Sequence, residues 1–298
     1  MISRKLYTYE VSNFVSSLIN ITKPRIISLL LITAMTGMYL ASDGHSPNLE
    51  IILFVLLGGA LGAGGANSIN NYIDRDIDLL MERTRIRPLA KGTIPPLVGL
   101  YLGITLNIIS FLILYYQVNF LSACLTMSAT LFYVFIYTMW LKRKTPQNIV
   151  IGGAAGAIPP VVGWTAITNE IGTPAIALFL IIFFWTPPHF WALSILLKDD
   201  YKKANIPMLS VVSSIQETAK QIVIYTFVLV LITMIFSLHS SVSYIYMISA
   251  GVLGSIFIYL SIRFKTDSTE SKARLLYIFS LLYLALLFLS IILDGFFA

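Results

Sequence analysis

Residues 51–92 read IILFVLLGGALGAGGANSINNYIDRDIDLLMERTRIRPLAKG, and this stretch decides the fold. A glycine-rich apolar run ends directly in a polar segment, where Asn70, Asp74 and Asp78 stand four residues apart. Four residues of helix turn a side chain by only about 40° and climb about 6 Å, so these three groups share one face. The stretch therefore predicts a membrane-spanning helix with a stripe of oxygen-bearing side chains at its end.

The composition is that of a polytopic membrane protein. Of the 298 residues, 57% are hydrophobic and 11% are charged, and the mean hydropathy is +0.83. Soluble domains average about 25% charged residues, so a soluble globular class is excluded. The single cysteine, Cys124, excludes an intrachain disulfide. We expect one transmembrane domain over residues 1–298, without a cleavable signal.

Further apolar runs follow along the chain, each near the ~20 residues that a bilayer requires. They lie at about 26–41, 50–70, 97–116, 119–140, 148–167, 174–197, 220–238, 243–262 and 275–293. Ahead of them, residues 6–19 have the i, i+3, i+4 apolar spacing of an amphipathic helix on a membrane surface, within an interfacial segment over 1–25. The sequence thus predicts an all-α protein with nine transmembrane helices.

The basic residues predict the orientation of these helices. All 20 Lys and Arg residues fall before the first run or between runs 2–3, 4–5, 6–7 and 8–9, while the alternate connections (42–49, 117–118, 168–173 and 239–242) have none. By the positive-inside rule the N-terminus is cytoplasmic and the C-terminus is outside. We expect the active face on the cytoplasmic side of the plasma membrane, and no nucleic-acid partner.

The polar segment after the second run suits a magnesium diphosphate. Mg²⁺ binds through one or two carboxylates, waters and substrate phosphates, so Asn70, Asp74 and Asp78 are candidate ligands. Arginine presents a planar fork to phosphate, which makes Arg83 and Arg87 candidate catalytic residues. Arg75, Arg85 and Lys91 complete a group of five basic side chains. The alternative interpretation is a solvated helix end with acid–base pairs at i,i+4 spacing.

Two further features lie near the end of the sixth run. Asp199 and Asp200 could hold a second Mg²⁺, although adjacent acids among lysines could also simply solvate a loop. His189 follows Pro187 and Pro188, which should weaken or kink the helix. An ionisable side chain at membrane depth is a functional candidate, and imidazole is a usual axial ligand of haem iron. The alternative role for His189 is a hydrogen bond that patches the kink.

The connection between runs 4 and 5 carries more cations. Lys142 and Arg143 are candidate substrate-binding residues, and anchoring to anionic lipid is their alternative role. Tyr137 is a candidate substrate contact, and with Tyr133 and Trp140 it could instead form an interfacial aromatic belt.

The pattern Asn70-xxx-Asp74-xxx-Asp78-xx-Met81-x-Arg83-Thr84-xx-Arg87-Pro88 resembles the first acidic motif of the intramembrane, UbiA-type aromatic prenyltransferases. Residues 22–25, 148–153, 159–164 and 189–209 are similar, in the same order, to the branch of that family that farnesylates haem. Two positions depart from the pattern. Asp199 and Asp200 are adjacent where other branches space their second acidic pair, and Ser210 stands where proline is expected.

The resemblance implies a Mg²⁺-dependent membrane enzyme that transfers the farnesyl group of farnesyl diphosphate to a vinyl group of haem B, giving haem O for terminal oxidases. Lys23 and Arg25 are then further candidates to neutralise the diphosphate. Membrane lipid, a haem A synthase and a terminal oxidase are the implied partners. The rival functions are prenylation of an aromatic acid in quinone synthesis and cation transport, and the five clustered basic residues argue against transport because they would repel a free cation.

Overall fold

The computed structural model describes residues 14–42 and 45–297, which contain helices and no strand. Nine segments of this described part are long and apolar enough to cross a membrane. They are α2 (Pro24–Ala41), α3 (Leu49–Ile73), α6 (Pro96–Gln117), α7 with its continuation (Phe120–Arg143), α8 with α9 (Asn148–Thr168), α10 (Thr173–Leu196), α13 (Ile215–Phe236), α14 (Tyr244–Thr266) and α15 (Glu270–Phe297). The prediction of an all-α protein with nine spans is confirmed.

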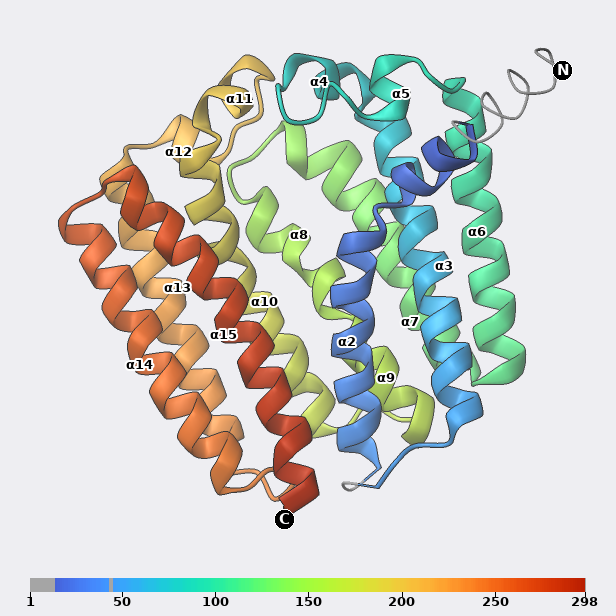
Figure 1. Ribbon diagram of the computed structural model, residues 1–298, viewed down its shortest axis with the longest axis vertical. Helices are drawn as coiled ribbons and strands as arrows, with labels where there is room; N and C mark the ends of the chain where they lie inside the picture. The colour runs from blue at the N-terminus through green and yellow to red at the C-terminus, as the bar shows by residue number, and fades with distance from the viewer. Residues whose placement is uncertain (1–13, 43–44, 298) are drawn as a thin grey trace, which may run out of the picture.

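Four short helices lie together at one end of the bundle (Figure 1). They are α4 (Arg75–Leu80), α5 (Pro88–Lys91), α11 (Lys198–Lys203) and α12 (Leu209–Val212). Helices α3, α6 and α7 lie on one side of the bundle and α13, α14 and α15 on the other, with α2, α8, α9 and α10 between them (Figure 1). The polar connections from distant parts of the sequence therefore meet at one end, which we call the basic end.

The fourth and fifth spans are irregular. Helix α7 (Phe120–Leu131) widens into a π-helix, η1 (Phe132–Trp140), and ends in a 3₁₀ turn, η2 (Leu141–Arg143). The hydroxyl of Thr138 donates to the carbonyl of Tyr133, five residues back, at 2.8 Å. The fifth span divides into α8 (Asn148–Ala157) and α9 (Pro159–Thr168). Proline lacks the N–H that continues a helix, and it is favoured in the first turn of a new one.

Some helices extend beyond their apolar runs. Helix α13 begins at Ile215 rather than at residue 220, because the Ser214 hydroxyl accepts the backbone N–H of Glu217 at 3.1 Å and caps the helix. Of the amphipathic segment predicted over 6–19, residues 6–13 lie outside the described part, and residues 14–22 are helical.

Helices α2 and α9 touch through their backbones. A Cβ on Gly163 would lie 1.9 Å from the carbonyl oxygen of Ala34, and a Cβ on Gly37 would lie 2.1 Å from that of Pro160. Small residues at such crossings let membrane helices approach closely. The contact holds α2, which begins directly after Lys23, against the centre of the bundle.

Candidate active site

The acidic stripe crosses the junction between α3 and α4. The backbone N–H of Asp74 bonds to the carbonyl of Asn70 at 2.9 Å, and that of Asp78 bonds to Asp74 at 2.8 Å, so i,i+4 spacing continues through the break. The Asn70 amide donates to Asp74 at 2.7 Å and to the Thr138 hydroxyl at 3.1 Å. All four side chains are buried. The π-helix thus contacts the stripe, which the sequence did not predict.

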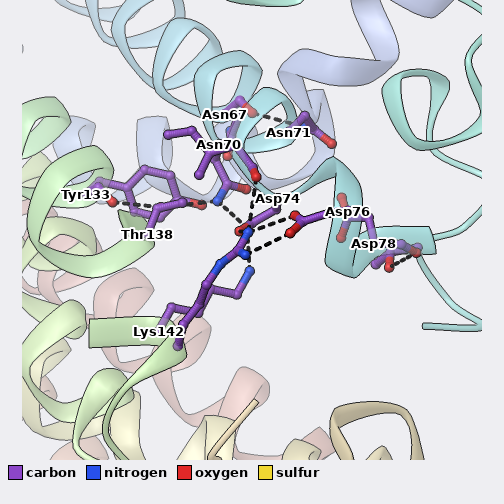
Figure 2. Close-up of polar contacts among 12 residues, drawn as sticks. Asn67, Asn70, Asn71, Asp74, Asp76, Asp78, Tyr133, Thr138 and Lys142 are labelled. Carbon is purple, nitrogen blue, oxygen red and sulfur yellow. Dashed lines mark hydrogen bonds and ion pairs between the residues drawn. The ribbon is translucent and has the colours of Figure 1, made fainter. Parts of the chain in front are cut away.

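Asp74 is the centre of the cluster (Figure 2). Its Oδ2 accepts from Asn70 and from the amine of Lys142, whereas its buried Oδ1 has no hydrogen-bond partner among the described residues. Nη2 of Arg143 lies 3.7 Å from Oδ1. An unpartnered buried acceptor costs roughly 1–3 kcal/mol, and more when it is charged. A carboxylate oxygen with that free capacity suits a hard cation, so this position fits the predicted Mg²⁺.

The neighbouring acids are also paired. One Nη1 atom of Arg87 donates to both oxygens of Asp78, at 2.9 and 2.8 Å, and the Asp78 side chain is only 3% exposed. Arg143 makes two parallel hydrogen bonds of 2.8 Å to Asp76, a carboxylate that is 61% exposed. The bonds from Arg143 hold the pKa of Asp76 below its ordinary value, against a smaller effect of burial. Each acid of the stripe thus faces a cation.

Lys23 reaches the cluster from the start of α2. Its amine donates to the carbonyl oxygen of the Asn70 side chain at 2.9 Å. Its backbone is left-handed, at φ 58° and ψ 61°, a conformation that costs a residue with a Cβ roughly 1–2 kcal/mol. Burial, then the charges of Arg87 and Lys142, lower the pKa of Lys23 to about 7. An anion bound among these three cations would favour their charged forms.

The second acidic pair is divided by the structure. Asp200 is buried and accepts the backbone N–H groups of Glu82 at 3.2 Å and Arg83 at 3.3 Å. Asp199 is exposed on α11. Within residues 14–42 and 45–297, no three His, Cys, Asp or Glu side chains form a group that could hold a metal. The structure brings Asp200 to the segment after the stripe and leaves Asp199 outside it.

Tyr137 faces the protein interior rather than forming an aromatic belt. Its ring stacks on Tyr133, with centroids 5.5 Å apart and planes at 22°, and it lies where a Cβ on Gly152 of α8 would be, 2.3 Å from ring carbon Cδ2. Trp140, by contrast, is 54% exposed and remains suited to a belt. The π-helix thus stacks two tyrosines on each other and brings Tyr137 against α8.

Two predicted arginines do not pair with the acids in the described structure. Arg25 is exposed beside the start of α2, and Arg83 is exposed in the segment after α4. Thr84, which the sequence analysis named only as a position of the motif, has a buried hydroxyl that donates to the carbonyl of Asp78 at 3.0 Å and fixes that segment. No spacing rule could have identified this contact, because it depends on how the 81–87 turn folds back.

His189 lies deeper in the bundle. Its ring stacks between Trp185, at a centroid distance of 4.3 Å, and Tyr277, at 4.9 Å, and its Nδ1 lies 2.7 Å from the hydroxyl of Ser280. Helix α10 runs from Thr173 to Leu196 as one element, with both prolines inside it. The hydrogen bond between His189 and Ser280 joins this continuous α10 to α15.

The structure thus defines a bundle of candidate membrane-spanning helices with acids, amines and guanidinium groups paired at one end. Residues 30–292 match the UbiA prenyltransferase family, and the chain belongs to this family. It is 49% identical over 278 residues to a protoheme IX farnesyltransferase of Gloeobacter violaceus, covering 93% of this chain and 91% of that relative.

A second relative of the same name, from Roseiflexus sp., is 48% identical over 276 residues, which cover 93% of this chain and 52% of the relative. The chain spans about half the length of the two Roseiflexus relatives that it matches.

Solved structures share the fold. A structure of digeranylgeranylglyceryl phosphate synthase has a TM-score of 0.80 at 16% identity, covering 94% of this chain and 98% of that one. A UbiA homologue from Archaeoglobus fulgidus, bound to GPP and Mg²⁺, has a TM-score of 0.64 at 18% identity, covering 92% and 99%. At these identities the likeness concerns the fold alone.

Proposed function

We propose that this protein transfers the farnesyl group of farnesyl diphosphate to a vinyl group of haem B, giving haem O, in a Mg²⁺-dependent reaction. The observation that carries the proposal is the buried acid–base cluster, where Asp74 keeps an unpartnered oxygen close to Lys142 and Arg143. The names of the relatives from Gloeobacter and Roseiflexus supply the acceptor and the length of the prenyl chain.

Asn70, Asp74 and Asp78 would hold the metal. Asp200, which is buried and accepts the backbone N–H groups of Glu82 and Arg83 in the segment after the stripe, is the candidate from the second acidic pair. When bound, Mg²⁺ supplies positive charge to the diphosphate as it departs. The homologue from A. fulgidus that is bound to DMAPP and Mg²⁺ supports a divalent ion in this family. For this chain, the support is the free capacity of Asp74 Oδ1.

The cations of the site act on the leaving group. As the allylic C–O bond breaks, negative charge grows on the diphosphate, so a fixed cation stabilises the transition state more than the ground state. The cations that already lie in this cluster are Arg87, beside Asp78, Lys142 and Arg143, beside Asp74, and Lys23, which donates to Asn70. Arg25 and Arg83, which are exposed, are the weaker candidates.

The acceptor half of the reaction takes place deeper in the membrane. The vinyl group of haem B supplies an electron pair to the allylic carbon, and the resulting cation beside the porphyrin takes up water and loses a proton. Porphyrin delocalises that charge, so the protein contributes mainly position. His189 is the candidate axial ligand, and Tyr137 is a candidate contact for the reacting groups. One face of the enzyme, the basic end, would lie in the cytoplasm, with the product passing to a terminal oxidase or a haem A synthase.

The test uses membranes that contain the protein, incubated with haem B, farnesyl diphosphate and Mg²⁺, followed by mass spectrometry of the extracted haem. We expect a haem heavier by one farnesyl group plus water, which disappears with EDTA and returns with added Mg²⁺. Asp74→Asn and Asp78→Asn should abolish it while the protein remains in the membrane. Conversion by intact protein of an aromatic acid, but not of haem, would contradict the proposed acceptor.

A further inference from the structure

The imidazole of His189 is fixed on three sides. Trp185 and Tyr277 cover its two faces, with interplanar angles of 18° and 29°, and Ser280 meets its Nδ1 edge. Trp185 also donates its indole N–H to the backbone carbonyl of Ser280 at 2.7 Å, which ties α10 to α15 at the same point. His189 and Ser280 are both buried. The ring is therefore held in one orientation by groups from two helices.

The hydroxyl of Ser280 decides where the proton of His189 lies. A serine hydroxyl has one proton to donate and can accept through its lone pairs. The Ser280 hydroxyl donates to the backbone carbonyl of Tyr277 at 2.6 Å, so its proton is already used. The 2.7 Å contact with His189 Nδ1 is then a hydrogen bond in which Nδ1–H is the donor and the hydroxyl oxygen accepts.

The other ring nitrogen is left without a proton. A neutral imidazole carries only one N–H, so a proton on Nδ1 makes Nε2 an acceptor whose lone pair lies in the ring plane. Nε2 has no hydrogen bond among the described residues. Trp185 and Tyr277 cover the faces of the imidazole, and the ring of Phe190 stands perpendicular to it with centroids 5.0 Å apart. The unprotonated Nε2 therefore has its lone pair in the ring plane, which is the direction in which an imidazole binds a metal ion.

We propose that Ser280 is a positioning residue that fixes His189 as the Nδ1–H tautomer and so presents the Nε2 lone pair to haem iron. This inference rests on the proposed function. A hydrogen bond to the second nitrogen is how proteins commonly orient an imidazole ligand and set its tautomer. His189 lies about two turns before the end of α10, roughly 10 Å from it along the helix axis. That depth places the porphyrin on the membrane side of the diphosphate cluster.

The first measurement is the tautomer itself, by NMR of the full-length protein in detergent with ¹⁵N-labelled histidine. His189→Ala identifies the signals, since the chain has three histidines. We expect the Nδ1–H pattern in the wild type, its loss or mixing in Ser280→Ala, and its return in Ser280→Thr, which keeps the hydroxyl. The matched control is Ser290→Ala in the same helix, because Ser290 is also buried and donates to the carbonyl of Leu287 at 2.8 Å, without a histidine partner.

The second measurement is titration of the same proteins with haem, followed by absorption and electron paramagnetic resonance. We expect a histidine-ligated spectrum in the wild type, and affinity about tenfold to a hundredfold weaker in Ser280→Ala, as for other groups that orient a metal-bound histidine. Ser290→Ala should match the wild type. An Nε2–H wild type, or a tautomer that Ser280→Ala leaves unchanged, would overturn the role of Ser280 whatever the haem does. The expected tautomer together with no haem binding would instead overturn the iron ligand and the haem acceptor.

Discussion

At the scale of single residues, the acidic stripe was predictable and its partners were not. Asn70, Asp74 and Asp78 followed from i,i+4 spacing, which is a local property of a helix. The pairing of Asp74 with Lys142 joins two spans that are far apart in the sequence, so only the tertiary packing could identify it. Adjacent residues of a helix point about 100° apart, which is why only one of Asp199 and Asp200 can face the site.

Asp200 and Asp199 make a matched pair for mutagenesis. We expect Asp200→Asn to lower kcat/KM about tenfold to a hundredfold, because the charge-assisted bonds to the N–H groups of Glu82 and Arg83 are each worth about 1.5–3 kcal/mol. Asp199→Asn, on the exposed side of α11, should stay within about twofold of the wild type. Steady-state assays of both variants decide the matter. Equal losses would mean that the adjacent acids act together.

Lys23 allows charge and backbone conformation to be separated. Lys23→Gly and Lys23→Ala both remove the amine that bonds to Asn70, so both should lose most activity. Glycine accepts the left-handed backbone at this position, whereas alanine keeps the Cβ clash. The free energy of unfolding of the glycine variant should therefore be about 1–2 kcal/mol higher than that of the alanine variant. Thermal unfolding in detergent measures the difference, and equal stabilities would show that the conformation carries no strain.

At the scale of helices, the apolar runs located each span but not its irregularities. The capping pair Ser214 and Glu217 was readable in the sequence and would have moved the start of α13 to Ile215. The proline pairs were not readable in this way. Pro159 and Pro160 begin a new helix, whereas Pro187 and Pro188 lie inside a continuous one. The Pro-Pro pair is common to both and its neighbours differ, so the pair alone does not decide whether a helix is interrupted.

The contact between α2 and α9 should be sensitive to a single methyl group. We expect Gly163→Ala to destabilise the protein by about 1–3 kcal/mol, because the new Cβ would overlap the backbone carbonyl of Ala34 and force the helices apart. Gly156→Ala is the control, since nothing lies within 4 Å of a Cβ there, and it should be neutral or up to about 1 kcal/mol more stable. Unfolding in detergent compares them. A stable Gly163→Ala variant would mean that this crossing is loosely packed.

At the scale of the whole molecule, the number of spans could be predicted because a bilayer leaves a chain few options. Every backbone polar group inside hydrocarbon must be bonded within the protein, so each apolar run long enough to cross becomes a helix. Basic residues occur only in alternate connections, and this alternation predicted which loops lie on the same side of the membrane. Helices α4, α5, α11 and α12 indeed gather at one end (Figure 1). Which side of the membrane that end faces is still a prediction.

Cysteine labelling tests the orientation. In a Cys124→Ala background, we expect His45→Cys to react with a membrane-impermeant maleimide in intact cells, because residues 42–49 connect spans on the outer side. Arg85→Cys, at an exposed position of the basic end, should react only after permeabilisation. The reverse pattern would place the active face outside.

The π-helix η1 makes the fourth span unusually dependent on its own length. Its wider turn takes up extra chain between the start of α7 and Lys142, and a π segment is a rare and costly form of helix. Deleting one residue from 132–140 would let the segment return to an α-helix, still apolar and still able to cross the membrane. The residues after it would then keep nearly the same phase, because the wider turn had already absorbed the extra residue. A deletion from the regular turns of α7 would instead rotate them by about 100° and carry Lys142 away from Asp74. Insertions and deletions, which most transmembrane helices tolerate only at their ends, are thus an evolutionary route by which this span could gain or lose its place in the active site.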